Sequence, residues 1–211
     1  NKQRYSQYLD KIIHIVVEDM PNTQNAWDNE NHQRRCISRG IDKLDLSEDD
    51  IIIISDVDEV PDIKTLATIK NNGINEVFSL EQDFYYYNLS CKMIKQKCYH
   101  AKIMSYKSFV INNKDPEKIR MSQAQAIQNG GWHFSYFGSI SFIKNKLQNF
   151  SHQEFNSQEY LDEQKIEKAI TKGKDLFNRR KGKFNHRQAV KFKKIKIEDN
   201  EYLPNNYELL L

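Results

Sequence analysis

Residues 51–61 read IIIISDVDEVP, and this stretch decides how the rest of the chain is interpreted. Four consecutive isoleucines have the length and the β-branched character of a buried strand. Asp56, Asp58 and Glu59 follow almost at once, so negative charge gathers where the strand ends. Like charges a few ångströms apart repel by about 4 kcal/mol near a protein surface, so a bound cation would stabilise this cluster.

The pair Asp56 and Asp58 predicts a metal site. Carboxylates two residues apart can converge from a turn, and oxygen ligands suit hard ions such as Mn²⁺ or Mg²⁺. We interpret Glu59 as a supporting neighbour of the two aspartates rather than a third ligand. The alternative is an acidic loop that caps a helix after Pro61.

The rest of the sequence alternates strand-like and helix-like segments. Apolar or alternating runs predict strands at 12–17, 50–55, 76–80, 83–89 and 130–138, a strand pair within 98–111 and a bulged edge strand at 189–197. Apolar residues at helical spacing predict helices at 29–43, 61–71, 139–150 and 158–172. Such alternation indicates an α/β fold with a mixed, mostly parallel sheet flanked by helices. In these sheets ligands bind beyond the carboxyl ends of the strands, where Asp56 and Asp58 are expected.

Composition excludes several classes of protein. The formal net charge of +3 over 211 residues is too small to indicate a nucleic-acid partner. No stretch approaches the ~20 apolar residues of a membrane span. The three cysteines form neither a disulfide framework nor a zinc-binding spacing, although Cys91 and Cys98 could pair across a hairpin. The abundance of Lys, Asn and Ile is typical of an AT-rich genome and favours the cytoplasm of a bacterium or virus-infected cell, or the Golgi lumen for a eukaryotic fragment.

Several separated motifs, in order along nearly the whole chain, resemble glycosyltransferase family 17, whose members resemble β-1,4-mannosyl-glycoprotein N-acetylglucosaminyltransferases. The motifs are ENHQRRCI (30–37), ISDVDEVP (54–61), GGWHFSYFG (130–138), FSHQEFN (150–156), GKDLFNRR (173–180) and YLPNNY (202–207). The resemblance implies a GT-A fold and an inverting transfer from a UDP-sugar donor, typically UDP-GlcNAc, to a glycan or glycoconjugate acceptor, with Mn²⁺.

The resemblance also bears on domain organisation. Family members usually begin with a further strand and helix that help to hold the nucleotide base. We therefore expect residues 1–211 to form one GT-A domain that is N-terminally incomplete, with a basic C-terminal tail or edge segment at 182–211.

The resemblance implies roles for basic and acidic residues near the donor. It places Arg34 near the phosphates, which guanidinium groups bind well, and makes Arg35 a second candidate. The two side chains point about 100° apart on a helix, so one of them is expected to face the site, unless both lie on a solvated basic face. Asp56 is expected to bind the metal or the ribose of the nucleotide, with Asp58 as the firmer metal ligand.

The motifs GGWHFSYFG and FSHQEFN supply further candidates. A late histidine in such enzymes often ligates metal or pyrophosphate, and we favour His133 as the metal ligand and assign His152 to the nucleotide-sugar. Trp132 is a candidate for stacking on a sugar. The alternative for His133 and Trp132 is packing within the core.

Inversion requires a carboxylate that takes the proton of the acceptor hydroxyl, and Glu154 is the first candidate, with Glu81 and Asp83 as rivals. Lys174, Asp175, Arg179 and Arg180 are candidates for a flap over the donor, and the alternative is a solvated basic stretch.

Two other functions stay open. One is a phosphotransferase or phosphatase with a nucleophilic aspartate, and the other is a carbohydrate-binding protein without turnover.

Overall fold

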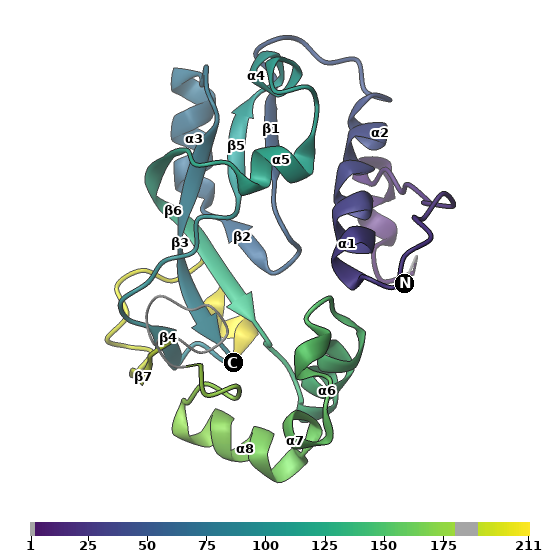
Figure 1. Ribbon diagram of the computed structural model, residues 1–211. Helices are drawn as coiled ribbons and strands as arrows, with labels where there is room; N and C mark the ends of the chain where they lie inside the picture. The colour runs from purple at the N-terminus through teal and green to yellow at the C-terminus, as the bar shows by residue number, and fades with distance from the viewer. Residues whose placement is uncertain (1–2, 180–189) are drawn as a thin grey trace.

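The computed structural model describes residues 3–179 and 190–211, which form one curled, mixed sheet flanked by helices (Figure 1). Along one path the strands run in the order β1-β5-β3-β4-β7, and β6 joins β3 to β2. Their bounds are β1 Ile51–Ile54, β2 Glu59–Pro61, β3 Phe78–Tyr86, β4 Cys91–Met93, β5 Lys102–Ser105, β6 Gln125–Ser135 and β7 Phe192–Lys194.

The prediction of a mostly parallel sheet is wrong. Among the described strand pairs β3–β6 is parallel, whereas β1–β5, β2–β6, β3–β4, β3–β5 and β4–β7 are antiparallel. The reason is a tight reversal after β3, where Tyr87 takes a positive φ of 68° and the amide of Asn88 bonds the carbonyl of Tyr86. Such a hairpin returns the chain antiparallel, and β4 and β5 therefore both run back along β3.

The helices begin where short polar side chains can cap them. Asn25, Asp62, Ser139 and Asp162 accept backbone N–H groups at the starts of α1, α3, α6 and α8. The bounds are α1 Ala26–Arg35, α2 Ile37–Ile41, α3 Ile63–Asn72, α4 Tyr106–Ile111, α5 Pro116–Met121, α6 Ile140–Asn149, α7 Gln158–Leu161 and α8 Glu163–Lys172, with 3₁₀ turns η1 Ser6–Lys11, η2 Gln153–Phe155 and η3 Tyr207–Leu210.

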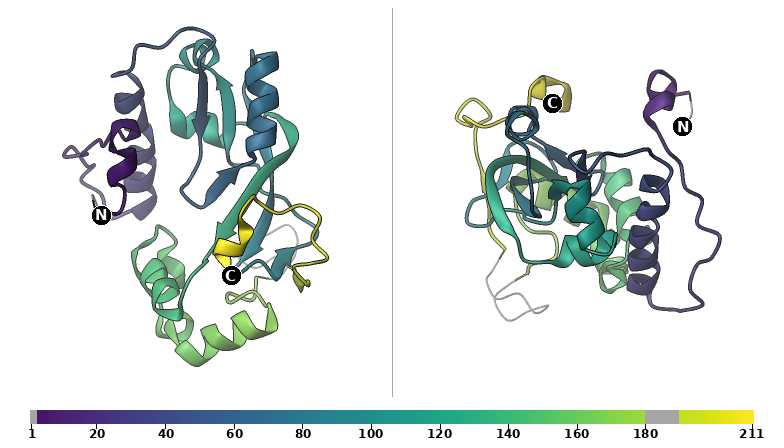
Figure 2. Two further views of the ribbon diagram at one scale, coloured as in Figure 1. Left: turned by 180° about the vertical axis from the view of Figure 1, so that it is seen from behind. Right: turned by 90° about the horizontal axis from the view of Figure 1, so that it is seen from above.

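Helices cover both faces of the sheet. On one face Ile69 of α3 packs with Leu80 and Ile103, and on the other Ile119 of α5 packs with Ile52 and Met104. The view from above shows α3 and α5 on opposite sides (Figure 2, right). Helices α6 to α8 form a third group below the sheet (Figure 1). Ile143, Leu147 and Ile166 of these helices share a core with Tyr86 of β3 and Cys91 of β4.

Several sequence-based elements have other boundaries than predicted. The strands predicted at 76–80 and 83–89 are parts of one strand, β3, which ends at Tyr86. The predicted strand pair in 98–111 is β5 followed by α4, and Asp62 rather than Pro61 precedes the first turn of α3. The helix expected at 29–43 starts earlier and is divided at Cys36, and that at 158–172 is divided at Asp162. The predicted edge strand is β7, which pairs with β4, and residues 182–189 of the predicted tail lie outside the described residues.

The strand predicted at 12–17 is wrong. These residues form no strand, and Val16 is 64% exposed. Alternate residues Ile13 and Ile15 lie against Gly40 of α2, so the two-residue period reflects packing on a helix rather than membership of the sheet. No helix in the described part of the chain combines the length and apolar character needed to cross a membrane.

Candidate active site

The acidic loop after β1 has a fixed backbone. The amide of Glu59 donates to the carbonyl of Asp56 (3.0 Å), and the amide of Phe134 in β6 donates to the carbonyl of Asp58 (2.8 Å). The side chain of Glu59 reaches back and accepts the amide of Asp56 at 2.9 Å. The loop conformation therefore depends on backbone bonds and on Glu59, and the carboxylates of Asp56 and Asp58 are left for other partners.

Asp56 lies between two arginines. Arg120 of α5 donates to it at 2.6 Å, and Arg34 of α1 approaches it at 3.4 Å. Arg34 also donates to Glu30 and Glu117, both at 2.8 Å, so it links α1, α5 and the loop. The Asp56 side chain is 43% exposed and can be reached from solvent.

Glu59 holds Arg120 in place. Its carboxylate is fully buried and accepts two bonds from the Arg120 guanidinium, at 2.7 and 2.8 Å. Burial favours the neutral acid, but the bonds and the charge of Arg120 outweigh it and keep the pKa of Glu59 below its usual value. Glu59 is thus ionised, and it supports Asp56 through Arg120.

Asp58 contacts a different pair of cations. Lys146 of α6 donates to it at 2.9 Å, and Nε2 of His133 in β6 lies 3.6 Å away. Burial opposes ionisation of Asp58, but the bond from His133 and the charge of Lys146 outweigh it and hold its pKa well below the usual value. Likewise, burial lowers the pKa of His133, but bonds to Asp58 and Cys98 outweigh this effect and raise the pKa to about 9. Both groups are therefore charged at neutral pH.

A second set of candidates lies in η2 and the turn before it, beside α1. Nδ1 of His152 is 2.7 Å from Oε1 of Glu154, and both side chains are 45% exposed. The His152 ring makes an edge contact with Trp27 of α1, with centroids 4.6 Å apart. The neighbouring Ser151 donates to Glu30, the same carboxylate that binds Arg34. This chain of contacts joins the predicted base to the acidic loop.

Other predicted residues lie away from this group. Trp132 is 3% exposed, packs on Tyr202 and donates its indole N–H to that residue's carbonyl, so its position does not support the prediction of sugar stacking. Arg35 is mainly exposed and lies 4.0 Å from Asp115. Of the rival bases, Asp83 is buried and paired with Lys92 and Lys97.

The flap predicted at Lys174 to Arg180 is only partly described, because Arg180 lies outside the described residues. Arg179 does not face the acidic loop. Its guanidinium bonds Asp175 and the hydroxyl of Tyr86, within the core shared with α8.

Sequence reasoning missed four residues of the site: Glu30, Glu117, Arg120 and Lys146. Lys146 had a signal, because it lies beside the apolar positions Ile143 and Leu147 of a predicted amphipathic helix and so near the core-facing edge of that helix. Arg120 had a weaker signal, because Asp115 followed by Pro116 is typical of a helix start but does not indicate which face of that helix meets the acidic loop.

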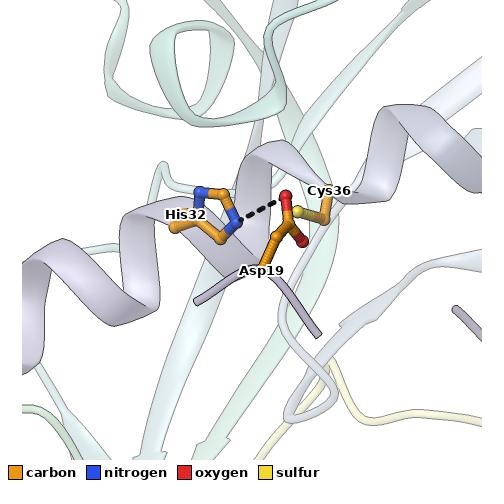
Figure 3. Close-up of side chains that lie close together, drawn as sticks. All are labelled: Asp19, His32 and Cys36. Atoms are coloured by element: carbon orange, nitrogen blue, oxygen red, sulfur yellow. Dashed lines mark ion pairs between the residues drawn. The ribbon is translucent and has the colours of Figure 1, made fainter. Parts of the chain in front are cut away.

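Two groups of three potential metal ligands have all their ligand atoms within 4.8 Å of one another in the described residues. One is Asp19, His32 and Cys36, near α1 and α2 (Figure 3), and the other is Glu59, Cys98 and His133. In the first group, His32 and Cys36 are one helical turn apart and Asp19 faces them, with its oxygens bonded to Arg39 at 2.7 and 2.6 Å. The predicted set Asp56, Asp58 and His133 does not meet this criterion, although His133 adjoins Asp58.

Comparison with known proteins gives one match. The model of glycosyltransferase family 17 matches residues 1–202, nearly the whole chain. No curated protein and no solved structure matches the chain significantly.

Proposed function

Because the chain belongs to glycosyltransferase family 17, and is therefore a glycosyltransferase, we propose that it transfers N-acetylglucosamine from UDP-GlcNAc to a glycan hydroxyl with inversion and with the help of a divalent ion. One observation carries the finer part of this proposal. Two partly exposed carboxylates, Asp56 and Asp58, share one loop with cations that arrive from α1, α5, α6 and β6.

The residues fit a hard metal ion. Asp56 and Asp58 offer oxygen ligands that solvent can reach, on a loop whose backbone is already fixed. When bound there, Mn²⁺ would act as a Lewis acid toward the charge on the departing diphosphate. Nε2 of His133 lies 3.6 Å from Asp58 and points its proton toward that carboxylate, so we assign His133 to orient Asp58 rather than to this ion.

A divalent ion would make the site suitable for an anionic donor. Arg34, Arg120, Lys146 and His133 bring four positive charges, and the five carboxylates that they contact in the described part of the chain, Asp56, Asp58, Glu30, Glu59 and Glu117, bring five negative ones, so a bound divalent ion would leave the group net positive. Arg34 is the guanidinium of the α1 pair that faces the loop, so we assign it to a donor phosphate. Arg35 has no role in this proposal.

Glu154 is the proposed base. Its carboxylate takes the proton of the acceptor hydroxyl while that oxygen attacks the anomeric carbon from the side opposite the leaving diphosphate, which inverts the configuration. His152 orients Glu154 through the 2.7 Å contact and is itself kept in place by the Trp27 ring.

The proposal is tested by a screen of nucleotide-sugars for hydrolysis, with and without Mn²⁺. We expect turnover of UDP-GlcNAc that stops with EDTA and returns with Mn²⁺. Asp58→Asn should lower kcat by about 10²-fold or more, as loss of one charge-stabilising group does. Asp45→Asn should leave kcat unchanged, because Asp45 is exposed and has no side-chain partner among the residues that the structure describes. Glu154→Gln should lower kcat by about 10²–10⁴-fold with little change in UDP affinity.

Three outcomes would contradict the proposal. Turnover that is unchanged by EDTA would show that the reaction needs no divalent ion. A trapped phospho-aspartate at Asp56 would instead establish phosphoryl transfer. Sugar affinity that survives Asp58→Asn, in a protein without turnover of any donor, would establish a binding protein.

A further inference from the structure

One face of the sheet brings four polar side chains together. Glu59 pairs with His133 across β2 and β6, and Phe84 pairs with His133 across β3 and β6. Gln82, two residues before Phe84, forms an isolated bridge with Cys98 in which each backbone amide bonds the other's carbonyl at 2.9 Å. Since paired residues share a face and side chains alternate along a strand, Glu59, Gln82, Cys98 and His133 lie on the same face.

The spacing of three of these side chains suits a tetrahedral metal ion. Sγ of Cys98 lies 3.3 Å from Nδ1 of His133 and 3.8 Å from Oε1 of Glu59. Zinc–sulfur and zinc–nitrogen bonds of about 2.3 and 2.0 Å at a tetrahedral angle place the two ligand atoms about 3.5 Å apart. The observed distances lie on either side of that value.

Gln82 gives a second, independent indication. Its side chain is fully buried, and neither its amide oxygen nor its amide nitrogen has a hydrogen-bond partner among the described residues. An unsatisfied buried amide costs about 1–3 kcal/mol, so it is rarely kept without a reason. The amide stands directly across the bridge from Cys98, where an ion or its bound water would satisfy the oxygen.

His133 has the second contact that metal-ligating histidines usually have. Its Nδ1 faces the cluster, while its Nε2 lies 3.6 Å from the Asp58 carboxylate. Histidine ligands commonly donate the other ring N–H to a carboxylate, which fixes the orientation of the ring.

We propose that Glu59, Cys98 and His133 form a zinc site, with Gln82 beside the open position, separate from the Asp56 and Asp58 pair. A thiolate and an imidazole favour Zn²⁺ over Mn²⁺ or Mg²⁺, which prefer oxygen. Binding releases the thiol proton of Cys98 and the Nδ1 proton of His133 to solvent. Zinc at Oε1 of Glu59 replaces one Arg120 donor there, while Arg120 keeps its bonds to Oε2 and to Asp56.

The other triad is the weaker candidate for the same ion. An arginine occupies both carboxylate oxygens in either triad, but Asp19 is 59% exposed whereas Glu59 is fully buried. Nε2 of His32 is also buried without a hydrogen-bond partner among the described residues, but it lies 3.6 Å from Asp19 and the His32 side chain is 25% exposed, whereas Gln82 is fully buried. This triad provides a test of which thiol binds, because the two groups use different cysteines.

The test is a titration of the metal-free protein with Zn²⁺ against a coloured chelator, and with Co²⁺ followed by thiolate charge-transfer absorption. We expect one Zn²⁺ per chain and a cobalt–thiolate band. Both should be lost, with affinity at least about 100-fold weaker, in Cys98→Ala, and kept in Cys91→Ala, a buried cysteine outside both triads. His133→Gln gives a second route to the same result if Cys98→Ala does not fold.

Three outcomes would overturn the inference. They are the absence of zinc binding by the wild-type chain, a band that persists in Cys98→Ala, and loss of binding in Cys36→Ala instead, which would assign the ion to the other triad. None of these readouts depends on glycosyl transfer, so the zinc site stands or falls separately from the proposed function.

Discussion

Replacing Arg120 by methionine tests how the acidic loop is supported. Arg120 is 6% exposed and makes three charge-assisted bonds, of 2.6 to 2.8 Å, to Asp56 and Glu59. Methionine fills most of the volume but leaves the fully buried Glu59 carboxylate without its cation. Loss of one partner of a buried pair costs about 3–5 kcal/mol, so we expect the free energy of unfolding to fall by that amount.

The assay is urea denaturation of the wild-type and variant proteins, with unchanged slopes as the condition for comparing free energies. Arg35→Met is the matched control, because Arg35 is mostly exposed and 4.0 Å from its acidic neighbour. Its loss should cost about 0.5 kcal/mol or less. The contrast separates the effect of the buried pair from that of removing an arginine.

A double variant identifies the cause of the loss. In Arg120→Met with Glu59→Leu no unpaired charge stays buried, although the Asp56 amide loses its acceptor. The double variant should therefore be more stable than Arg120→Met alone by about 1 kcal/mol or more. A cost below about 1 kcal/mol for Arg120→Met, or a double variant that loses the sum of the two single costs, would refute this account of the loop.

Three further predictions concern stability. The pKa of His133 is raised from 6.5 to about 9 in the folded protein, so protonated His133 adds about 3 kcal/mol to the free energy of unfolding. This contribution is complete below pH 6.5 and is lost as the pH rises through 9. The free energy of unfolding of His133→Gln, measured against pH, should lack this dependence. Gly131→Ala would place Cβ 2.1 Å from the carbonyl oxygen of Val60 at a φ of 136°, so it should lower the free energy of unfolding by about 2–3 kcal/mol. Gly73→Ala has open space around its Cβ and should lower it by about 1 kcal/mol. Chemical denaturation measures both. Leu147→Ala removes a fully buried side chain of α6 and should lower the free energy of unfolding by about 2–5 kcal/mol, and a loss below 1 kcal/mol would argue against the core assigned to α6–α8.

The local features of the fold could be predicted from the sequence. The run Ile51–Ile54 and the apolar spacing of 139–150 depend on residues close together in the chain, and both elements are found. Strand direction could not be predicted, because the reversal after β3 uses Tyr87 at a positive φ and contains neither glycine nor proline. Without that turn, alternating strands and helices indicated parallel pairing.

The candidate site was predictable only in part. Asp56 and Asp58 belong to one short motif, whereas Arg120 and Lys146 reach them from residues far along the chain. Trp132 and His133 show a different limit. Neighbours in a strand point to opposite faces, so only one of the two could face Asp58, but the sequence does not tell which face of β6 that is. Glu59, Cys98 and His133 are likewise far apart in the sequence, so no local spacing indicates that they meet.

The anchoring of the acidic loop by the amides of Glu59 and Phe134 has a consequence for the free energy of ligand binding. Since these bonds involve main-chain carbonyls, the carboxylates of Asp56 and Asp58 can exchange one partner for another while φ and ψ stay constant. Preorganisation of this kind removes most of the ordering cost of association. Hydrogen exchange at Glu59 and Phe134 should therefore be slow before a ligand arrives and change little afterwards.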